Sequence, residues 1–462
     1  MSQAMSGRQA VERGDSAWRW VNTMLLVAFV SLLLLVPWGY KAVSLTALML
    51  ALMGAVLRRD PTREQPERLD AEDRLWLLAF MAFSGLWCLD LARSGVLLGL
   101  ERGSEAMPLW PLLTAGLLMW WRRHPPLRAG LWLGLVVGGT GAGVIALYER
   151  FLLGAYRADN GMNAIPFGNL SLLIGVLALA AMLGRLCRPP LPLPWLTPAL
   201  GLSAIAGLAA SFLSGTRGGW VAVPLLAWLS YRAFRPFLPR RRLLQLVGGG
   251  WLLVIGLVAM TAITDYGVTK RVERAIDDIR HYVLEGDGGS SVGLRLEMWQ
   301  AGGRMFREKP LLGWGEGRLE GARDMMVESG VLHPGARCHD QLHSDLVDTA
   351  ARRGLLGVVT LLAFYGVPAV LFARHLRRAH DAQARVLALS GLLVVIAFMG
   401  FGLTQSMLRD VRGLSGYLGL TMACWVLLRA RLIELGRQSN IEPDAARKVT
   451  MRGRTDESRK TC

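Results

Sequence analysis

The sequence predicts an all-α, polytopic membrane protein with about 12 membrane-spanning helices and one large helical loop outside the membrane. Three observations predict this fold class. The chain of 462 residues is 52% apolar but only 19% charged, whereas a soluble domain is about one quarter charged. Its apolar residues gather in long runs, and its positive charges gather in alternate connections between those runs. This composition excludes a disordered chain, and five scattered cysteines exclude a disulfide scaffold.

The apolar runs are close to the roughly 20 residues that a helix needs to cross a bilayer. The predicted spans cover residues 20–38, 42–57, 74–92, 107–121, 126–147, 164–184, 191–213, 218–234, 243–263, 355–373, 386–408 and 413–430. The first run is interpreted as an uncleaved span, because no small-x-small cleavage site follows it. In the fifth span, Gly130, Gly134 and Gly138 recur every four residues, which favours a face for close helix packing over a hinge.

The positive charges predict the orientation of the spans, since Lys and Arg concentrate in short cytoplasmic loops. With the N-terminus in the cytoplasm, the cytoplasmic connections carry the basic runs at 58–59, 122–123, 240–242 and 377–378. The short loops of the opposite side carry few basic residues and no run of them, and both termini are expected in the cytoplasm. The formal net charge of +17 therefore reports topology and contact with anionic membrane lipids, and no nucleic-acid partner is predicted.

This topology divides the chain into four regions. Residues 1–263 carry nine spans, residues 264–354 form one large extracytoplasmic loop, residues 355–430 carry three spans, and residues 431–462 form a basic cytoplasmic tail. The charges of the large loop nearly balance, and its periodic pieces 268–282 and 294–306 predict amphipathic helices. A loop of about ninety residues with its own helices is usually functional.

Two arginines on the outer side are candidates for binding an anion. Arg217 lies in the turn Ser-Gly-Thr-Arg-Gly-Gly at residues 214–219, whose glycines leave backbone N–H groups uncovered beside the guanidinium. The alternative is an ordinary turn with an arginine that snorkels to water. Arg295 begins a predicted helix of the large loop. Its guanidinium could clamp a phosphate, or it could pair with a nearby carboxylate.

Three of the seven histidines, His333, His339 and His343, lie near the end of the large loop. If this piece is helical, His339 and His343 share a face one turn apart. That spacing is similar to the zinc motif H-E-x-x-H, but Asp340 replaces the glutamate and no third ligand stands at a motif spacing. A role as general base requires only a single neutral imidazole, whose ordinary pKa lies near neutrality, and no set of metal ligands. Surface histidines without chemistry remain the alternative.

The sharpest motif is His343-Ser344, then nine residues, then a G-x-x-G at residues 354–357. It resembles the pattern of the O-antigen ligases, in which His is followed by Asn, Ser or Gln, nine residues and G-x-x-G. Arg217 in its turn is similar to an essential outer arginine of that family, and Arg295 to a second one in the periplasmic loop. Phe167-Gly168-Asn169 resembles a recurrent element of the wider superfamily, which also contains O-antigen polymerases and bacterial O-oligosaccharyltransferases.

The resemblance implies an enzyme that transfers O-antigen polysaccharide from an undecaprenyl-diphosphate donor to the lipid A–core acceptor. The reaction would occur at the periplasmic face of a Gram-negative inner membrane, invert the anomeric centre, and use neither a metal ion nor a cofactor. By this resemblance His343 is the general base, while Arg217 and Arg295 bind the diphosphate and stabilise the leaving group. The residues expected to contact substrate are His339, Ser344, Gly215, Thr216 and Gly218.

Two alternatives stay open from the sequence. A polymerase or a protein O-oligosaccharyltransferase would use the same donor and differ only in its acceptor, which motif spacing does not settle. A transporter of an anionic lipid or solute belongs to a different class, and Asp90 and Gln405 are the best polar candidates inside its spans. Against a transporter, the hydropathy pattern shows no internal repeat.

Overall fold

The computed structural model describes residues 2–57, 69–95, 106–187, 193–242, 245, 249 and 290–458. The secondary structure of these residues is helical, with no strand, so the all-α prediction is confirmed for the described part of the chain. The longer helices are α1 (Ser2–Leu35), α2 (Gly39–Leu57), α3 (Ala71–Ser94), α4 (Trp110–Arg123), α5 (Arg128–Leu147), α6 (Ala164–Leu186), α7 (Leu196–Leu213), α8 (Val223–Phe234), α11 (Ser291–Glu308), α12 (Arg318–Glu328), α13 (Asp345–Arg378), α14 (Ala382–Gly402) and α15 (Val411–Ser458). Short helical turns are η2 (Met107–Leu109), η3 (Tyr148–Leu152), η4 (Gly218–Ala222), η5 (Pro334–Cys338) and η6 (Met407–Arg409).

Eight of the described helices are long and apolar enough to cross a membrane. Their candidate spans are Ser16–Leu35, Gly39–Val56, Ala71–Ser94, Arg128–Leu152, Ala164–Leu186, Leu196–Leu213, Asp345–Arg378 and Ala382–Gly402. Each of them overlaps a predicted span. Helices α4 and α8, with 14 and 12 residues, occupy two further predicted spans but are shorter than a bilayer crossing. The predicted span 243–263 lies almost wholly outside the described residues, so the count of twelve stays a prediction.

Helix α5 packs closely against α1 through the glycine face that its sequence predicts. A Cβ atom built on Gly134 would lie 2.8 Å from Cβ of Val30, and one on Gly138 would lie 2.9 Å from the Val30 carbonyl oxygen. Gly130 approaches Thr23 equally closely, at 2.8 Å. A larger side chain at these positions would push the two helices apart. The interpretation of these glycines as a packing face is therefore confirmed.

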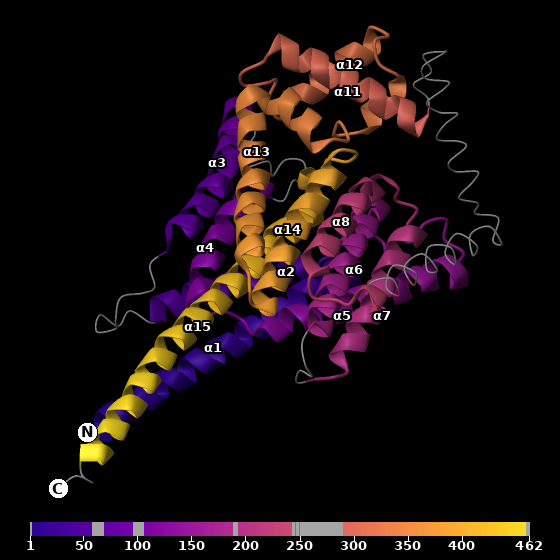
Figure 1. Ribbon diagram of the computed structural model, residues 1–462. Helices are drawn as coiled ribbons and strands as arrows, with labels where there is room; N and C mark the ends of the chain where they lie inside the picture. The colour runs from indigo at the N-terminus through magenta and orange to yellow at the C-terminus, as the bar shows by residue number, and fades with distance from the viewer. Residues whose placement is uncertain are drawn as a thin grey trace.

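Helices α11 and α12 belong to an outer region, residues 290–344, that covers one end of α13 (Figure 1). This region has a core of its own, which includes Met298 and Met305 of α11, Leu319 of α12 and Ala351 of α13. In Figure 1 it lies at the opposite end of the molecule from the start of α1 and the end of α15. The helix predicted at 294–306 is confirmed within α11, whereas the one predicted at 268–282 lies outside the described residues.

Helix α13 is kinked at Gly354, whose φ of 61° and ψ of −154° lie in a region that is essentially open only to glycine. At the kink, the backbone pairs with the segment after α11. The N–H of Leu355 donates to the carbonyl oxygen of Pro310 (2.7 Å), and the N–H of Gly315 donates to that of Arg352 (2.9 Å). A Cβ atom on Gly354 would lie 2.6 Å from the Pro310 carbonyl oxygen. The first glycine of the G-x-x-G motif thus lets the outer region close onto α13.

Candidate active site

His343 lies where the outer region meets α13, in a backbone conformation that few residues other than glycine adopt. Its φ of 53° is left-handed, and only 8% of its surface is exposed. Ser344 follows as the N-cap residue of α13. The Ser344 hydroxyl donates to the carbonyl oxygen of Gly402 at the end of α14 (3.1 Å). This bond fixes the start of α13, and with it His343, against α14.

Each ring nitrogen of His343 has a polar partner. Nδ1 lies 2.8 Å from Oε1 of Gln405, and Nε2 lies 3.2 Å from Nδ1 of His339. The two imidazole rings meet edge to face, with 4.7 Å between their centroids. The segment between them is irregular, so the helix considered for aligning these rings does not form, and a loop brings them together instead. His339 and His343 are called the histidine pair below.

The surroundings of the histidine pair favour the neutral form of both rings. Burial lowers the pKa of His343, and the positive charge of Arg295 lowers it further. The hydrogen bond with Gln405 raises this pKa and so partly offsets the effect of burial. Burial also lowers the pKa of His339, and the guanidinium groups of Arg295 and Arg323 lower it further. An imidazole whose pKa lies below the usual value of about 6.5 keeps a lone pair at neutral pH, as a general base requires.

Arg295 projects from the first turns of α11 and is half-buried. Burial lowers the pKa of its guanidinium, and the positive charge of Arg157 lowers it further. Within the described residues, Arg295 forms no ion pair with a carboxylate, so the alternative of a carboxylate partner finds no support there. Two like charges held near each other in a partly buried place favour an anion between them.

The turn at 214–219 is fixed by hydrogen bonds to its neighbours. The Thr216 hydroxyl donates to the carbonyl oxygen of Ala164 at the start of α6 (2.8 Å). Arg157 donates to the carbonyl oxygen of Ser214 (2.7 Å) and to the Thr216 hydroxyl (3.2 Å). The positive charge of Arg157 also lowers the pKa of Arg295 on α11, so Arg157 brings a second positive charge near that guanidinium. Arg157, Arg295 and the turn are called the basic side below.

Two glycines shape the turn around Arg217. Gly215 has a φ of 68°, which a residue with a Cβ atom rarely adopts. A Cβ atom on Gly218 would lie 2.2 Å from Oγ1 of Thr404, the residue before Gln405. Arg217 stands between these glycines as the N-cap residue of η4 and has interaction partners of its own. The turn that carries Arg217 therefore packs against the loop that supplies the partner of His343.

The element Phe167-Gly168-Asn169 lies beneath the turn. A Cβ atom on Gly168 would lie 2.1 Å from Oγ of Ser214, and one on Gly219 would lie 2.2 Å from Oδ1 of Asn169. The side chains of Asn169 and Ser214 are almost wholly buried. This element therefore contributes a small, close-fitting surface of α6 on which the turn rests.

A cavity of about 690 Å³ opens beside the histidine pair. His339 and Gln405 line it, whereas His343 is not among the described residues of its wall. Its wall also contains apolar residues and a set of aromatic, acidic and basic side chains: Trp38, Tyr40, Trp87, Glu316, Glu320, Asp340, Asp410, Lys41, Arg409 and Arg412. Aromatic rings beside carboxylates suit a hydroxyl-rich ligand such as a sugar, which offers apolar faces and hydrogen-bond donors. The mixed charge of this cavity contrasts with the basic side.

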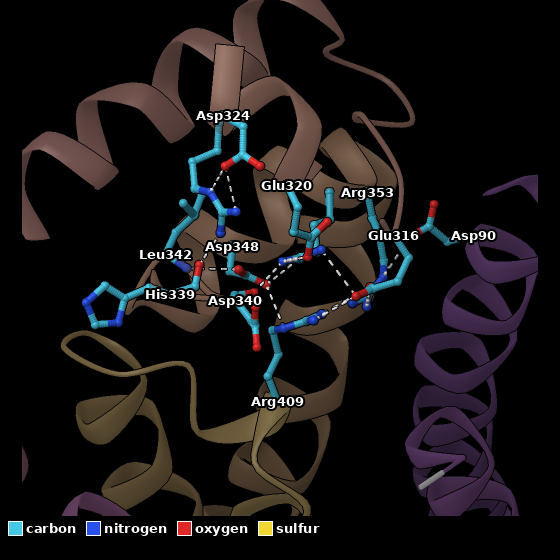
Figure 2. A network of polar contacts seen from close by, with 12 residues as sticks. Asp90, Glu316, Glu320, Asp324, His339, Asp340, Leu342, Asp348, Arg353 and Arg409 are labelled. Carbon is cyan, nitrogen blue, oxygen red and sulfur yellow. Dashed lines mark hydrogen bonds and ion pairs between the residues drawn. The ribbon is translucent and has the colours of Figure 1, made fainter. Parts of the chain in front are cut away.

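Glu316 lines the cavity and is the shared carboxylate of a set of largely buried ion pairs, which Figure 2 shows as dashed lines. Its carboxylate oxygens lie 2.7 Å from Arg409, 3.2 Å from Arg352 and 3.5 Å from Arg353. Burial alone would raise the pKa of Glu316, but Arg352 and Arg409 outweigh it and hold that pKa far below its usual range. The carboxylate is therefore ionised and paired at all pH values near neutrality.

These ion pairs join the outer region to the long helices. Arg352 of α13 also pairs with Glu320 of α12 (2.9 Å) and with Asp348 (3.0 Å). Arg353 lies 3.6 Å from Asp90 of α3, and Figure 2 shows Asp90 facing this group from a separate helix. The polar residue of the third predicted span is thus part of an ion-pair arrangement. The charge network below means Asp90, Glu316, Glu320, Asp348, Arg352, Arg353 and Arg409.

Parts of this site carry little signal in the sequence. Gln405 stands out there only as a polar group within a span, and Arg157 and Glu316 do not stand out as site residues. A buried amide between apolar spans could have pointed to Gln405, because such a group needs a polar partner. Arg157 and Glu316 offer no local signal, since the groups they bind lie 57 and 93 residues away in the chain.

His333 lies apart from the histidine pair and supports the loop. Its Nδ1 accepts a hydrogen bond from the N–H of Gly335 (3.1 Å), which caps η5. Its own N–H donates to the carboxylate of Glu297 on α11 (2.8 Å). In the part of the chain that the structure describes, no three His, Cys, Asp or Glu side chains are grouped as ligands for a metal ion.

Known proteins share parts of this chain. Residues 202–362 match the family described as O-antigen ligase, and the matched stretch contains the Arg217 turn, α11 and the histidine pair. A protein of Haemophilus influenzae, described as uncharacterized, is 23% identical over 317 residues, which make up 68% of this chain and 77% of that protein. The matched family includes O-antigen ligases and polymerases, which are membrane glycosyltransferases acting on lipid-linked glycans. The family resemblance that the motifs indicated is thereby confirmed for residues 202–362.

Proposed function

We propose, because this multi-span membrane protein carries a domain of the O-antigen ligase family, that it transfers O-antigen polysaccharide from undecaprenyl diphosphate to the lipid A–core oligosaccharide. The observation that supports the proposal most is the position of His343. It is a buried imidazole, favoured in its neutral form, next to the basic side and next to the cavity. A base in that place can serve a reaction between an anionic donor and a hydroxyl-bearing acceptor.

The donor diphosphate binds on the basic side. Arg217 and Arg295 hold its oxygens, and Arg157 fixes the turn between them. As the bond to the sugar breaks, negative charge grows on the departing diphosphate, and guanidinium groups already in place stabilise it. These arginines supply the positive charge that the leaving group needs, so the reaction as proposed uses neither a metal ion nor a cofactor.

The acceptor sugar enters the cavity of about 690 Å³. One of its hydroxyl oxygens attacks the anomeric carbon of the donor from the face opposite the diphosphate. The new glycosidic bond forms as the bond between the anomeric carbon and the diphosphate oxygen breaks, so the configuration inverts. The hydroxyl proton goes to the histidine pair, with His343 as the general base. Undecaprenyl diphosphate leaves with both electrons of the broken bond.

Four other residues expected at the substrate act by holding the main groups in place. Gly215 and Gly218 give the turn its shape, and Thr216 anchors it to α6. Ser344 anchors the backbone beside His343 to α14. Loss of any of these contacts would displace a catalytic side chain, and small misplacements of reacting groups slow a reaction strongly.

The proposal includes a membrane orientation. The outer region and the site face the periplasm of a Gram-negative cell, both termini face the cytoplasm, and the four regions keep the boundaries predicted at 263, 354 and 430. The position of the outer region, opposite the ends of α1 and α15, supports this orientation (Figure 1). In that arrangement two lipid-linked substrates can reach the site from the outer leaflet.

The decisive experiment offers one donor to three acceptors. Purified protein in detergent receives undecaprenyl-diphosphate-linked O-antigen together with lipid A–core, with a growing O-antigen glycan, or with a pilin-like protein. Product on lipid A–core alone supports the ligase. Product only on the growing glycan or on the protein would replace it by a polymerase or an O-oligosaccharyltransferase. If the same protein, reconstituted into vesicles, moves the donor across the membrane without forming any product, a transporter would replace the ligase.

A further inference from the structure

The cavity reaches His339 but not His343. His339 is half-buried and lines the cavity wall, whereas His343 is 8% exposed and lies behind it. The Nε2 atom of His343 is 3.2 Å from Nδ1 of His339. A hydroxyl group that enters the cavity therefore meets the ring of His339 before it can approach His343. This arrangement raises the question of which nitrogen takes the proton of the acceptor.

The neighbours of the two rings fix where their protons lie. With Oε1 of Gln405 at 2.8 Å, Nδ1 of His343 must carry a hydrogen in order to donate to it. In a neutral imidazole the other nitrogen is then an acceptor, so Nε2 of His343 presents a lone pair to Nδ1 of His339. Nδ1 of His339 must carry the hydrogen of that contact. This leaves Nε2 as the acceptor nitrogen of His339, the ring of the pair that lines the cavity.

We propose that His339 is a second catalytic residue, which takes the proton of the acceptor hydroxyl while passing its own proton to His343. The inference rests on the proposed transfer reaction. The O–H bond of the acceptor breaks and a new N–H bond forms at Nε2 of His339. At the same time the Nδ1–H bond of His339 breaks and an N–H bond forms at Nε2 of His343. His339 ends neutral, and His343 ends as an imidazolium whose Nδ1–H still donates to Gln405.

Charged groups from several elements surround this relay. Arg295 of α11 faces both rings, and Arg323 of α12 faces His339, to whose carbonyl oxygen it also donates. Asp340 in the same loop opposes their effect on His339, and Asp348 of α13 opposes it on His343. The arginines disfavour a resting positive charge on either ring. Asp348 and Gln405 favour the transient charge on His343, the ring on which the relay places it.

The test compares two substitutions of His339 in the full-length protein. In His339→Asn a side-chain N–H can still donate toward His343, but no group can pass a proton on. We expect kcat to fall by about 10²- to 10⁴-fold, the usual contribution of a general base, with little change in the KM of the acceptor. In His339→Ala the ring leaves a space open to the cavity, and added imidazole should restore part of the lost rate. A matched His380→Asn variant, at an exposed histidine, should behave as wild type.

Several results would overturn the relay. Near-normal kcat in His339→Asn would make His343 the only base. A raised KM with unchanged kcat, or loss of rate in His339→Ala without rescue by imidazole, would make His339 a binding or packing residue. A readout independent of turnover is the ¹⁵N shift of the ring nitrogens: the relay requires hydrogen on Nδ1 of His343 and a bare Nε2. The opposite tautomer contradicts the relay even if transfer occurs, whereas the expected tautomer without any transfer contradicts only the proposed function.

Discussion

The histidine pair and the charge network are neighbouring groups of buried polar side chains, but they differ in the charge state that their surroundings favour. Both meet the loop between α14 and α15, the first through Gln405 and the second through Arg409. The charge network buries ionised groups, each matched to a partner of opposite sign within 3.6 Å. The histidine pair buries two rings whose neighbours favour the neutral form, and one ring remains open to the cavity.

This difference in charge state indicates different roles: the charge network stabilises the fold, and the histidine pair takes part in the reaction. Ionised groups that are paired with each other are held in their charged state and do not readily exchange a proton, and separating them is costly. A neutral ring with a free lone pair next to a cavity can accept a proton, because no partner of opposite charge holds it in one state. The charge network therefore holds the outer region on α3 and α13, and the histidine pair, a few residues away, is free to react.

The substitution with the largest expected effect removes the shared carboxylate of the charge network. Replacing Glu316 with Ala leaves Arg352, Arg353 and Arg409 without their shared carboxylate. We expect the free energy of unfolding to fall by about 3–5 kcal/mol, as when one partner of a buried pair is removed. Thermal unfolding in detergent measures it.

A matched control for this change is Glu328→Ala. Glu328 forms an exposed pair with Arg337 in the same outer region, and such pairs contribute about 0–1 kcal/mol. Equal stability of the Glu316 and Glu328 variants would refute the supporting role of the charge network. Because the pKa of Glu316 is held far below its usual range, its contribution should also stay constant from about pH 5 to 8 and weaken only in stronger acid.

The next effect concerns the basic side. In Arg217→Lys and Arg295→Lys the positive charge stays but the planar, two-pronged donor is lost. Loss of a charge-assisted hydrogen bond costs about 1.5–3 kcal/mol, so each variant should lose about 10- to 150-fold in kcat/KM for the donor. Folding should be unaffected. Rates at several donor concentrations measure this change.

Arg304→Lys is the control for the basic side. Arg304 lies on α11, the helix of Arg295, but is exposed. We expect its donor kinetics to match wild type. Donor kinetics of Arg295→Lys that match those of Arg304→Lys would count against a diphosphate contact at Arg295.

The smallest effect is a shift in pH dependence. Gln405→Glu places a carboxylate beside Nδ1 of His343, and an opposite charge at that distance raises a histidine pKa by about 1–3 units. A protonated His343 cannot act as a base, so activity is lost as the pH falls through the pKa of this ring. That pKa lies below 6.5 in the wild type, and we expect the loss to occur at a higher pH in the variant. Above the raised pKa the two rates should converge.

The pH profile of kcat measures this shift, with Gln300→Glu as the control. Gln300 is exposed on α11. An acid limb at the same pH in Gln405→Glu and wild type would show that the ring does not titrate in the rate-limiting step.

Much of the fold follows from local sequence. The long apolar runs and the glycine repeat of α5 placed helices and one packing face correctly, because both depend on residues close in the chain. The left-handed φ of His343 and the loop that joins the histidine pair carry no such periodic pattern. That pair therefore formed through an irregular loop, where the sequence suggested a helix.

The site was predictable in its motifs and not in its connections. Arg217, Arg295 and His343 stood out because each belongs to a short, recognisable pattern. Their supports come from far along the chain: Gln405 lies 62 residues from His343, and Arg409 lies 93 residues from Glu316. Such pairings depend on how the helices pack in space, and no local pattern of residue types encodes them.

The central claim is that His343 performs chemistry and does not support the fold. His343→Asn tests it well, because asparagine tolerates the left-handed backbone at this position. The measurement is the rate of glycan transfer to lipid A–core by equal amounts of folded wild-type, His343→Asn and His380→Asn protein. We predict thermal unfolding near that of wild type in all three, with transfer reduced at least about 10²-fold in His343→Asn alone. Transfer by folded His343→Asn at the wild-type rate would contradict the account.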